Sequence, residues 1–324
     1  MRKVRLAVIC LEGLDGFTQW IEPLQEFYEV KMFIIRNDDD LIRAIGFGDV
    51  IWCEWANEAA MAVAEMLSRR DKNQDKKKLI VRLHSYEAFS DYPNRIKWDF
   101  VDHIVYVAEH IPEIINTYYH TWNINARTDH TVVPNGVDIS GIKLNKDTSR
   151  YKICSVGGIS HKKNPAMILQ IFKKLLEKDA RYRLHIAGAY QEPRYEVYFN
   201  HMINEMDLMG KVVMYGQVKD MDTFYKDKDF ILNTSVHEGH CVSIIEAMAR
   251  GITPIVHNYY GADRQYREGF RFNTIQEAVG RILSRPLEPN IAAESYRQYV
   301  IDHNWTLESQ VNSFKDVINE VYLI

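Results

Sequence analysis

The sequence has few cysteines, no long apolar stretch and no strong excess of one charge. Its 324 residues include only four cysteines, which are scattered and form no CxxC pair. This pattern excludes a disulfide framework and a structural zinc site, and it is typical of a reducing, cytoplasmic environment. No apolar run approaches the ~18–20 residues that cross a bilayer, so we expect no membrane-spanning helix.

The charges are distributed unevenly along the chain. Residues 1–140 carry 16 Lys and Arg against 22 Asp and Glu, and residues 141–324 carry 24 against 22. Neither half is basic enough for nucleic acid to be a main partner, and the basic run at 69–78 is typical of a solvated loop. The basic and then apolar start resembles a signal peptide, but acidic residues soon follow, so we interpret residues 4–10 as a buried strand.

Short apolar runs alternate with amphipathic stretches through most of the chain. The runs lie at 4–10, 30–35, 50–52, 79–83, 104–107 and 131–133, and then at 151–156, 182–187, 212–215, 230–232 and 253–256. This alternation predicts an α/β protein with two Rossmann-like domains, each a parallel sheet covered by helices on both faces. We expect domains at 1–143 and 144–300, and a C-terminal helix at 301–324 that packs back toward the first domain. Ligands of such sheets bind beyond the carboxyl ends of the strands, so the expected site is a cleft between the domains.

The segment 233–251 carries the most chemical information. A strand end is followed by a glycine-containing loop, and we expect a helix to begin at about His240. The free backbone N–H groups at the start of that helix suit a phosphate. Glu238 lies in the loop, and Glu246 lies about two turns into the helix among apolar neighbours. An enclosed carboxylate needs hydroxyl or amide donors, and a ribose diol supplies two.

These residues resemble a known motif. Glu238 and Glu246 are separated by seven residues and are followed by Ala-Met-Ala-x-Gly, which looks like the EX7E motif of retaining GT-B glycosyltransferases, family 4 in particular. The segments 132–138 (VVPNGVD) and 155–165 (SVGGISHKKNP) and the strand ends at 186–188 and 215–218 match the same family in order. The resemblance is specific over about 130–260 and weaker over the first domain.

The resemblance implies a division of labour between the domains, with the acceptor bound by the first and a nucleotide-sugar donor by the second. It implies no cofactor and no metal ion. The catalytic residues would be Glu238 at the donor sugar, His84 at the sugar or the reacting centre, and Lys163, whose charge would neutralise the diphosphate as it leaves. Glu246 would accept hydrogen bonds from the ribose. The other expected donor contacts are Gly239, His240, Cys241, Val242, Lys162, Gly158, Gly216, Val218 and Gly16.

One position departs from the family pattern. The family usually has Arg just after the first glycine of the 155–165 loop, and this chain has Gly158 there. Lys162 could substitute, but a lysine is a point charge and does not reproduce the bidentate fork of arginine. Two alternatives to a transferase therefore stay open: a protein that binds a nucleotide sugar without transferring it, and a nucleotide-sugar epimerase of the same architecture.

Several other signals concern the first domain. Glu54 and Asn57 follow a strand, and we expect them to contact the acceptor, a hydroxyl-bearing carbohydrate or lipid-linked molecule. The run 37–40 (NDDD) resembles a metal-binding acidic motif, but a helix cap is the favoured interpretation. Trp52, Trp55 and Trp98 are interpreted as buried aromatics rather than sugar platforms. We expect a cytoplasmic location, with peripheral contact at the inner membrane face left open.

Overall fold

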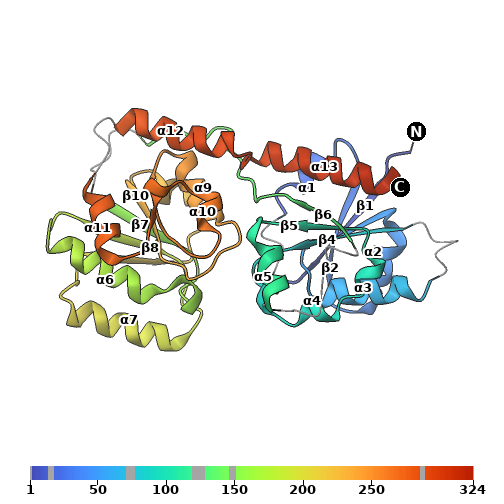
Figure 1. Ribbon diagram of the computed structural model, residues 1–324, viewed down its shortest axis with the longest axis horizontal. Coiled ribbons are helices and arrows are strands. Elements are labelled where there is room, and N and C mark those ends of the chain that lie inside the picture. Colours follow the sequence, from blue (N-terminus) through green and yellow to red (C-terminus); the bar gives the residue numbers. More distant parts are fainter. Residues whose placement is uncertain are drawn as a thin grey trace. The chain divides into compact units, whose positions relative to one another are not determined.

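The computed structural model describes residues 2–13, 18–70, 77–118, 128–145, 151–284 and 289–323. It divides into two compact units, which comprise Met1–Asp138 with Thr306–Ile324 and Ile139–Trp305 (Figure 1). We call them unit 1 and unit 2. These bounds differ by a few residues from the expected 1–143, 144–300 and 301–324. The chain re-enters unit 1 at Thr306, which forms a parallel bridge with Val137, and the Leu307 N–H donates to the Val137 carbonyl at 2.8 Å.

Unit 1 is built on a parallel sheet with the order β2-β1-β3-β4-β5-β6. Its strands are β1 (Arg5–Leu11), β2 (Glu29–Ile35), β3 (Val50–Cys53), β4 (Lys78–Leu83), β5 (His103–Tyr106) and β6 (Asp129–Val132). Its described helices are α1 (Ile21–Leu24), α2 (Asp38–Phe47), α3 (Glu58–Ser68), α4 (Tyr92–Arg95), α5 (His110–Tyr118) and α13 (Leu307–Leu323).

The central strands of unit 1 are apolar at nearly every position because both faces of the sheet are covered. Alternate residues such as Ile9 and Ile51 pack in one core with side chains of α2, α3 and α5. The residues between them, such as Val8 and Trp52, pack in a second core with α1 and α13, where Phe314 is fully buried. Successive residues of a strand point to opposite faces, so a strand covered on both sides shows an unbroken apolar run.

Unit 2 repeats this architecture with the order β12-β11-β10-β7-β8-β9. Its strands are β7 (Lys152–Val156), β8 (Arg183–Ala187), β9 (Val212–Gly216), β10 (Phe230–Asn233), β11 (Thr253–His257) and β12 (Arg271–Phe272). Its described helices are α6 (Pro165–Leu176), α7 (Pro193–Glu205), α8 (Met221–Tyr225), α9 (Val242–Ala249), α10 (Ala262–Gln265), α11 (Ile275–Leu283) and α12 (Pro289–Asp302). Helices α6, α7 and α11 lie on one face of the sheet and α9 and α12 on the other (Figure 1).

Two loops of unit 2 meet at the carboxyl ends of β7 and β8. Gly188 has φ of 150°, and a Cβ there would lie 1.9 Å from the Gly157 carbonyl oxygen. Both the backbone angle and the close approach require glycine. The Gly157 N–H in turn donates to the Ala187 carbonyl at 2.9 Å. The ends of β7 and β8 are therefore in direct backbone contact.

Helices α2 and α6 begin in different ways. Asn37 caps α2 by accepting the Asp40 N–H at 3.0 Å, which confirms the interpretation of the acidic run as a helix start. Pro165 begins α6. Asn164 at the cap position is left-handed, with φ of 49°, and its side chain makes no capping hydrogen bond. Its carbonyl is instead held by the Thr234 hydroxyl at 3.1 Å.

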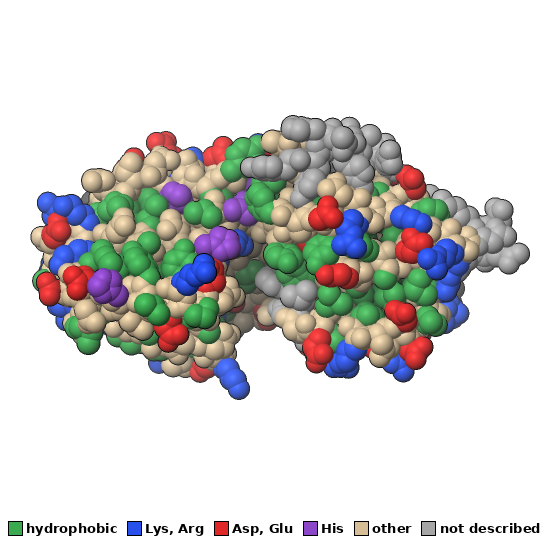
Figure 2. All heavy atoms as spheres, turned by 90° about the horizontal axis from the view of Figure 1, so that it is seen from below, with side chains coloured by type: hydrophobic (Ala, Val, Ile, Leu, Met, Phe, Trp, Pro, Cys, Tyr) green, Lys and Arg blue, Asp and Glu red, His purple; other side chains and the backbone are tan. Residues whose placement is uncertain are grey.

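The surface carries charges of both signs. On the face drawn in Figure 2, the described basic and acidic side chains are interspersed, and neither sign forms a large continuous field. All four cysteines are buried free thiols. Of the helices in the described ranges, none has both the length and the apolar composition needed to span a bilayer.

Candidate functional site

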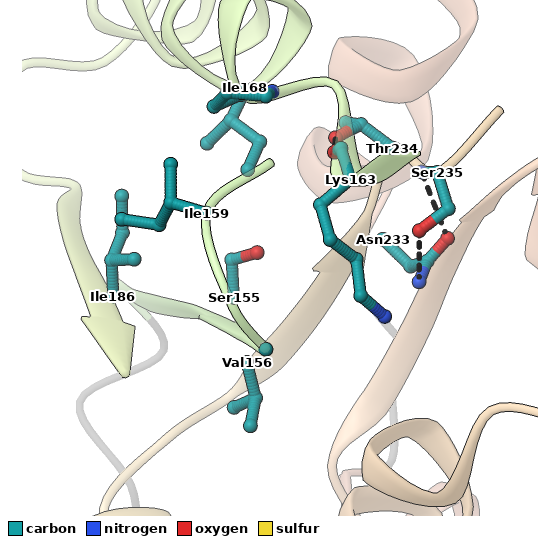
Figure 3. Close-up of a pocket in the computed structure, with 11 residues that line it drawn as sticks. Ser155, Val156, Ile159, Lys163, Ile168, Ile186, Asn233, Thr234 and Ser235 are labelled. Carbon is teal, nitrogen blue, oxygen red and sulfur yellow. Dashed lines mark hydrogen bonds between the residues drawn. The ribbon is translucent and has the colours of Figure 1, made fainter. Parts of the chain in front are cut away.

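Unit 2 has a pocket at the carboxyl ends of β7 and β10 (Figure 3). Its lining comes from the end of β7, the loop that leads to α6, the start of α6, β8, and the end of β10. The residues are Ser155, Val156, Gly157, Ile159, Lys163, Pro165, Ile168, Ile186, Asn233, Thr234 and Ser235. The side chain of Lys163 extends along the pocket past Asn233, with its ammonium group toward the end of β7 (Figure 3).

A buried carboxylate lies beside this pocket and is held by two lysines. The Lys163 Nζ is 2.5 Å from Glu238 Oε1, and the Lys162 Nζ is 2.9 Å from Glu238 Oε2. The Ser235 hydroxyl donates to Oε1 at 2.7 Å. The structure thus brings together three of the residues singled out in the sequence and adds Ser235, which sequence reasoning missed.

The charges of this cluster favour the ionised forms of Glu238 and Lys163. Burial alone would raise the pKa of Glu238, but the two ammonium groups lower that pKa to about 2. Burial would likewise lower the pKa of Lys163, but the charge of its neighbours, Glu238 among them, raises it. Glu238 is therefore a fixed anion with acceptor capacity only, and Lys163 is a fixed cation.

The loop that carries Glu238 is tied down at three points. The Val236 N–H donates to the Lys162 carbonyl at 2.9 Å, and the Thr234 hydroxyl donates to the Lys163 carbonyl at 2.7 Å. Farther along, the buried Gln265 amide donates to the Gly239 carbonyl at 2.5 Å. A trans peptide points its N–H opposite to its carbonyl, so this bond directs the His240 N–H away from Gln265. Gln265 gave no signal in the sequence.

Helix α9 begins at Val242, two residues later than expected, with Cys241 at the cap position. Cys241 makes no side-chain cap to the helix, and its buried thiol contacts Ser243 Oγ at 3.3 Å and receives the Asn233 amide at 3.6 Å. Burial raises the pKa of the Cys241 thiol. The ring of His240 packs edge-on against Trp305, with centroids 4.6 Å apart.

Glu246 lies on α9 and is half-buried. The Tyr225 hydroxyl lies 3.3 Å from Glu246 Oε2 and donates also to the Ser243 carbonyl at 3.1 Å. Burial raises the pKa of Glu246, while the neighbouring Arg250 and the tyrosine hydroxyl oppose that effect. A hydroxyl partner was expected for this carboxylate, but nothing in the sequence identified Tyr225 as its source.

The remaining donor residues lie at neighbouring strand ends. Gly158 follows β7, and a Cβ there would lie 2.4 Å from the Gln191 Nε2, so the Gln191 side chain occupies the space beside Gly158. Gly216 ends β9 with φ of 62°, and its carbonyl accepts the Gly188 N–H at 2.7 Å. Val218 follows two residues later and is half-buried. Gly16 lies outside the described residues.

The first-domain candidates lie at the carboxyl ends of β3 and β4 in unit 1. His84 is the first residue after β4; its ring stacks on Trp55, with centroids 4.1 Å apart and planes 22° apart. Glu54 follows β3, and its Oε1 is 3.4 Å from His84 Nε2. Burial lowers the pKa of His84 even though Glu54 opposes that effect.

Glu54 and Asn57 do not fit the acceptor contacts predicted for them. The Glu54 carboxylate is wholly buried and is bound by the Arg82 Nη1 at 2.7 Å and the Trp52 Nε1 at 2.9 Å. Asn57 is buried and caps α3 by accepting the Ala59 N–H at 3.0 Å. Trp52 is itself fully buried, as predicted. Both candidates serve the interior of unit 1, because the residues that follow a strand can turn inward as easily as outward.

The chain is similar in sequence and in fold to known proteins. Residues 139–286 match the family model described as Glycosyl transferases group 1. The alpha-monoglucosyldiacylglycerol synthase of Streptococcus pneumoniae is 20% identical over 245 residues, which cover 69% of this chain and 52% of that protein. The trehalose synthase of Pyrococcus horikoshii is 22% identical over 255 residues, which cover 71% and 61%. The crystal structure of Anabaena Alr3699/HepE in complex with UDP and glucose has a TM-score of 0.78 at 15% identity and covers 98% of this chain and 100% of that one.

These similarities cover different shares of the chains compared. The chain spans about half to three-fifths of the length of these curated relatives. The match to Alr3699/HepE extends over almost the whole of both chains, and at 15% identity it shows the fold. The predicted α/β fold class, a GT-B fold with two parallel sheets, is confirmed. The family model falls on unit 2, which holds the Glu238 cluster.

Proposed function

We propose that this protein is a retaining glycosyltransferase that moves a sugar from a nucleoside diphosphate donor to a hydroxyl acceptor without a metal ion. The observation that carries the proposal is the Glu238 carboxylate, buried beside the strand-end pocket of unit 2 and bound by Lys162, Lys163 and Ser235. The match of residues 139–286 to the group 1 glycosyltransferase model supports it.

Lys163 supplies a cation for the leaving diphosphate. An ammonium group has three N–H donors, so Lys163 can hold Glu238 and a phosphate oxygen at the same time. A fixed charge in a partly enclosed site stabilises the negative charge that develops on the leaving group without reorganising. In the described residues, no three His, Cys, Asp or Glu side chains are grouped as metal ligands. The lysine pair is the source of positive charge in this proposal.

Glu238 has a chemistry suited to holding the sugar rather than attacking it. A carboxylate in two ion pairs with a pKa of about 2 is a weak nucleophile, but it is an effective acceptor for sugar hydroxyls. This favours departure and attack on the same face of the sugar, which retains the anomeric configuration without a covalent intermediate. His84, from unit 1, would contact the sugar or the reacting centre.

Glu246 is assigned to the ribose. Its half-buried carboxylate already accepts from the Tyr225 hydroxyl, and its remaining lone pairs suit the ribose hydroxyls. We propose a UDP-sugar as the donor, since the similar Alr3699/HepE and the pneumococcal O-GlcNAc transferase GtfA were crystallised with UDP. The acceptor is proposed to be a carbohydrate or a lipid-linked hydroxyl compound, reached in the cytoplasm or at the inner membrane face.

The test is a ligand panel followed by a transfer assay. Thermal shift with UDP, GDP, ADP and their sugars should show one base that stabilises the protein strongly, because a ligand that binds the native state raises its melting temperature. Slow hydrolysis of the matching UDP-sugar, with the anomeric configuration read by NMR, then tests transfer and retention. The reaction should persist with EDTA, and Glu246→Gln should weaken UDP binding. If no nucleotide stabilises the protein, the proposal is wrong.

A second candidate is a protein that binds the nucleotide sugar without transferring it. The observation in its favour is Gly158, beside which the neutral Gln191 amide lies where a cationic side chain would begin. Binding of UDP without any hydrolysis of UDP-sugars would favour this candidate. A change of the sugar itself, with no acceptor present, would indicate an epimerase instead.

A further inference from the structure

Unit 1 contains an ion pair that is completely buried. Arg82 on β4 and Glu54 at the end of β3 both have 0% exposure, and the Arg82 Nη1 is 2.7 Å from Glu54 Oε1. The second guanidinium nitrogen donates to Asn135 Oδ1 at 2.7 Å, and the guanidinium carbon lies 5.0 Å from the ring centroid of Phe314 on α13. Trp52 donates to the other carboxylate oxygen of Glu54 at 2.9 Å.

Stability alone does not account for this pair. The loss of hydration of two buried charges offsets much of their attraction, and apolar residues of similar volume are often as stable. Here, however, each partner is held by a further hydrogen bond: Glu54 accepts one from Trp52 on β3, and Arg82 donates one to Asn135. The geometry of the carboxylate is therefore defined by β3, β4 and the segment that contains Asn135.

The carboxylate so fixed faces His84. Its Oε1 lies 3.4 Å from His84 Nε2, while Trp55 stacks on the imidazole at 4.1 Å between centroids. The stack sets the plane of the ring, and Nε2 is the ring nitrogen that lies in ion-pair range of the carboxylate. An ionised carboxylate only accepts hydrogen bonds, so it favours the form of the ring in which the nitrogen that faces it carries a proton.

Two other charged or titratable groups near His84, Arg82 and Glu87, do not supply a negative charge to its ring. Arg82 faces the ring from β4 and lowers the pKa of His84. Glu87, on the short 3-10 helix Glu87–Phe89, is fully buried, and its Oε1 accepts the Ala56 N–H at 3.0 Å. Burial raises the pKa of Glu87 to about 8, so this carboxyl group is mostly neutral at pH 7. Among the described groups that act on His84, Glu54 is therefore the negative one.

We propose that Glu54 and Arg82 are positioning residues for His84: their buried pair orients the imidazole and places its proton on Nε2. The proposal rests on the proposed function, in which His84 contacts the sugar or the reacting centre. It assigns Glu54 to the interior of the site, in place of the acceptor contact that the sequence predicts.

The first measurement does not depend on activity. The pKa of His84 is followed by NMR in the full chain, with its signal assigned by comparison with His84→Asn. Glu54→Gln removes the carboxylate that raises this pKa, so the His84 pKa should fall. Because Glu54→Gln leaves Arg82 buried without a counter-charge, Glu54→Gln/Arg82→Met is the second variant, in which neither charge remains and the fold should persist. The matched control is Glu58→Gln at an exposed position of α3, which should leave the His84 pKa unchanged.

The second measurement is sugar transfer, made beside UDP binding. Both Glu54 variants should lower turnover by roughly up to a hundredfold, the effect of misplacing a reacting group by about 1 Å, while the Kd for UDP stays unchanged. A His84 pKa that does not fall in folded Glu54→Gln overturns the positioning proposal, whether or not the protein transfers sugar. In the double variant, which also loses the Arg82 charge that lowers this pKa, turnover is the readout, and unchanged turnover there overturns the proposal. A shifted pKa with unchanged turnover also overturns it. A shifted pKa in a protein that neither binds UDP nor transfers sugar supports the positioning of His84 and overturns the proposed function.

Discussion

Replacement of Glu238 by glutamine tests the electrostatics of the unit 2 cluster directly. The substitution keeps the shape of the side chain and removes the charge that Lys162 and Lys163 share. The pKa of Glu238 lies at about 2, compared with an ordinary value of 4.5. A depression of this size corresponds to about 3 kcal/mol of stabilisation at neutral pH, because each pKa unit is worth about 1.4 kcal/mol. For a unit of this size the melting temperature should fall by roughly 6–12 °C.

The pH dependence has a definite sign. A carboxyl group with a lowered pKa in the folded state stabilises the protein above its unfolded pKa, and this contribution is lost as the pH falls through the folded pKa. The difference between the wild type and Glu238→Gln should therefore be full at pH 7 and begin to shrink below about pH 4.5. About half of it should be gone near pH 3.

Urea denaturation at several pH values is the assay, and Glu177→Gln is the control. Glu177 makes the same kind of ion pair, with Lys174, but both side chains are close to half exposed. An exposed pair contributes about 0–1 kcal/mol, so the control should lie near the wild type at every pH. A Glu238→Gln variant as stable as the control at pH 7 would refute the reasoning. So would a difference that does not decrease toward pH 3.

Three other substitutions probe separate features. Tyr225→Phe removes a hydroxyl donor to Glu246 and should raise the Kd for UDP about fivefold in calorimetric titration, the effect of about 1 kcal/mol. Gly188→Ala should prevent folding or greatly lower the melting temperature, because its Cβ would overlap a carbonyl oxygen. Phe314→Ala should destabilise unit 1 by about 3–5 kcal/mol in urea denaturation, since this ring is fully buried against the sheet.

Each of these three substitutions has a control, which is either a modified ligand or a second substitution in the chain. The Tyr225→Phe effect should shrink with 2′,3′-dideoxy-UDP, and an equal loss with both ligands would mean that the hydroxyl does not act through Glu246. Gly280→Ala is the partner of Gly188→Ala: it lies in α11 with open space around its Cβ and should stabilise the helix by about 0.5–1 kcal/mol. Tyr322→Ala, at a half-exposed position of α13, should cost far less than Phe314→Ala, and equal losses would contradict the packing described.

Much of the fold could be predicted from the sequence because apolar periodicity reports burial. The runs at 4–10 and 79–83 are apolar at all positions except Arg5 and Arg82, as a strand covered on both faces requires, and both form inner strands of the unit 1 sheet. The glutamate pair lies in the loop and helix that follow β10 of unit 2, as the order of elements in the sequence predicts. The roles of Tyr225 and Gln265 could not be predicted, because a hydrogen bond between residues some 20 or more positions apart has no local sequence pattern.

The amino-acid sequence by itself determined the α/β class, the two parallel sheets and the position of the Glu238 loop, since these depend on local periodicity and on short-range spacing. Only the tertiary structure decided what the carboxylates do. Glu238 is bound by lysines that lie about 75 positions earlier in the chain. Glu54, which follows a strand as a ligand contact does, is instead enclosed by Arg82 and Trp52. The charge state and the hydrogen bonds of a carboxylate depend on its neighbours in space. Those neighbours come together only when the strands assemble into sheets and the helices pack on them.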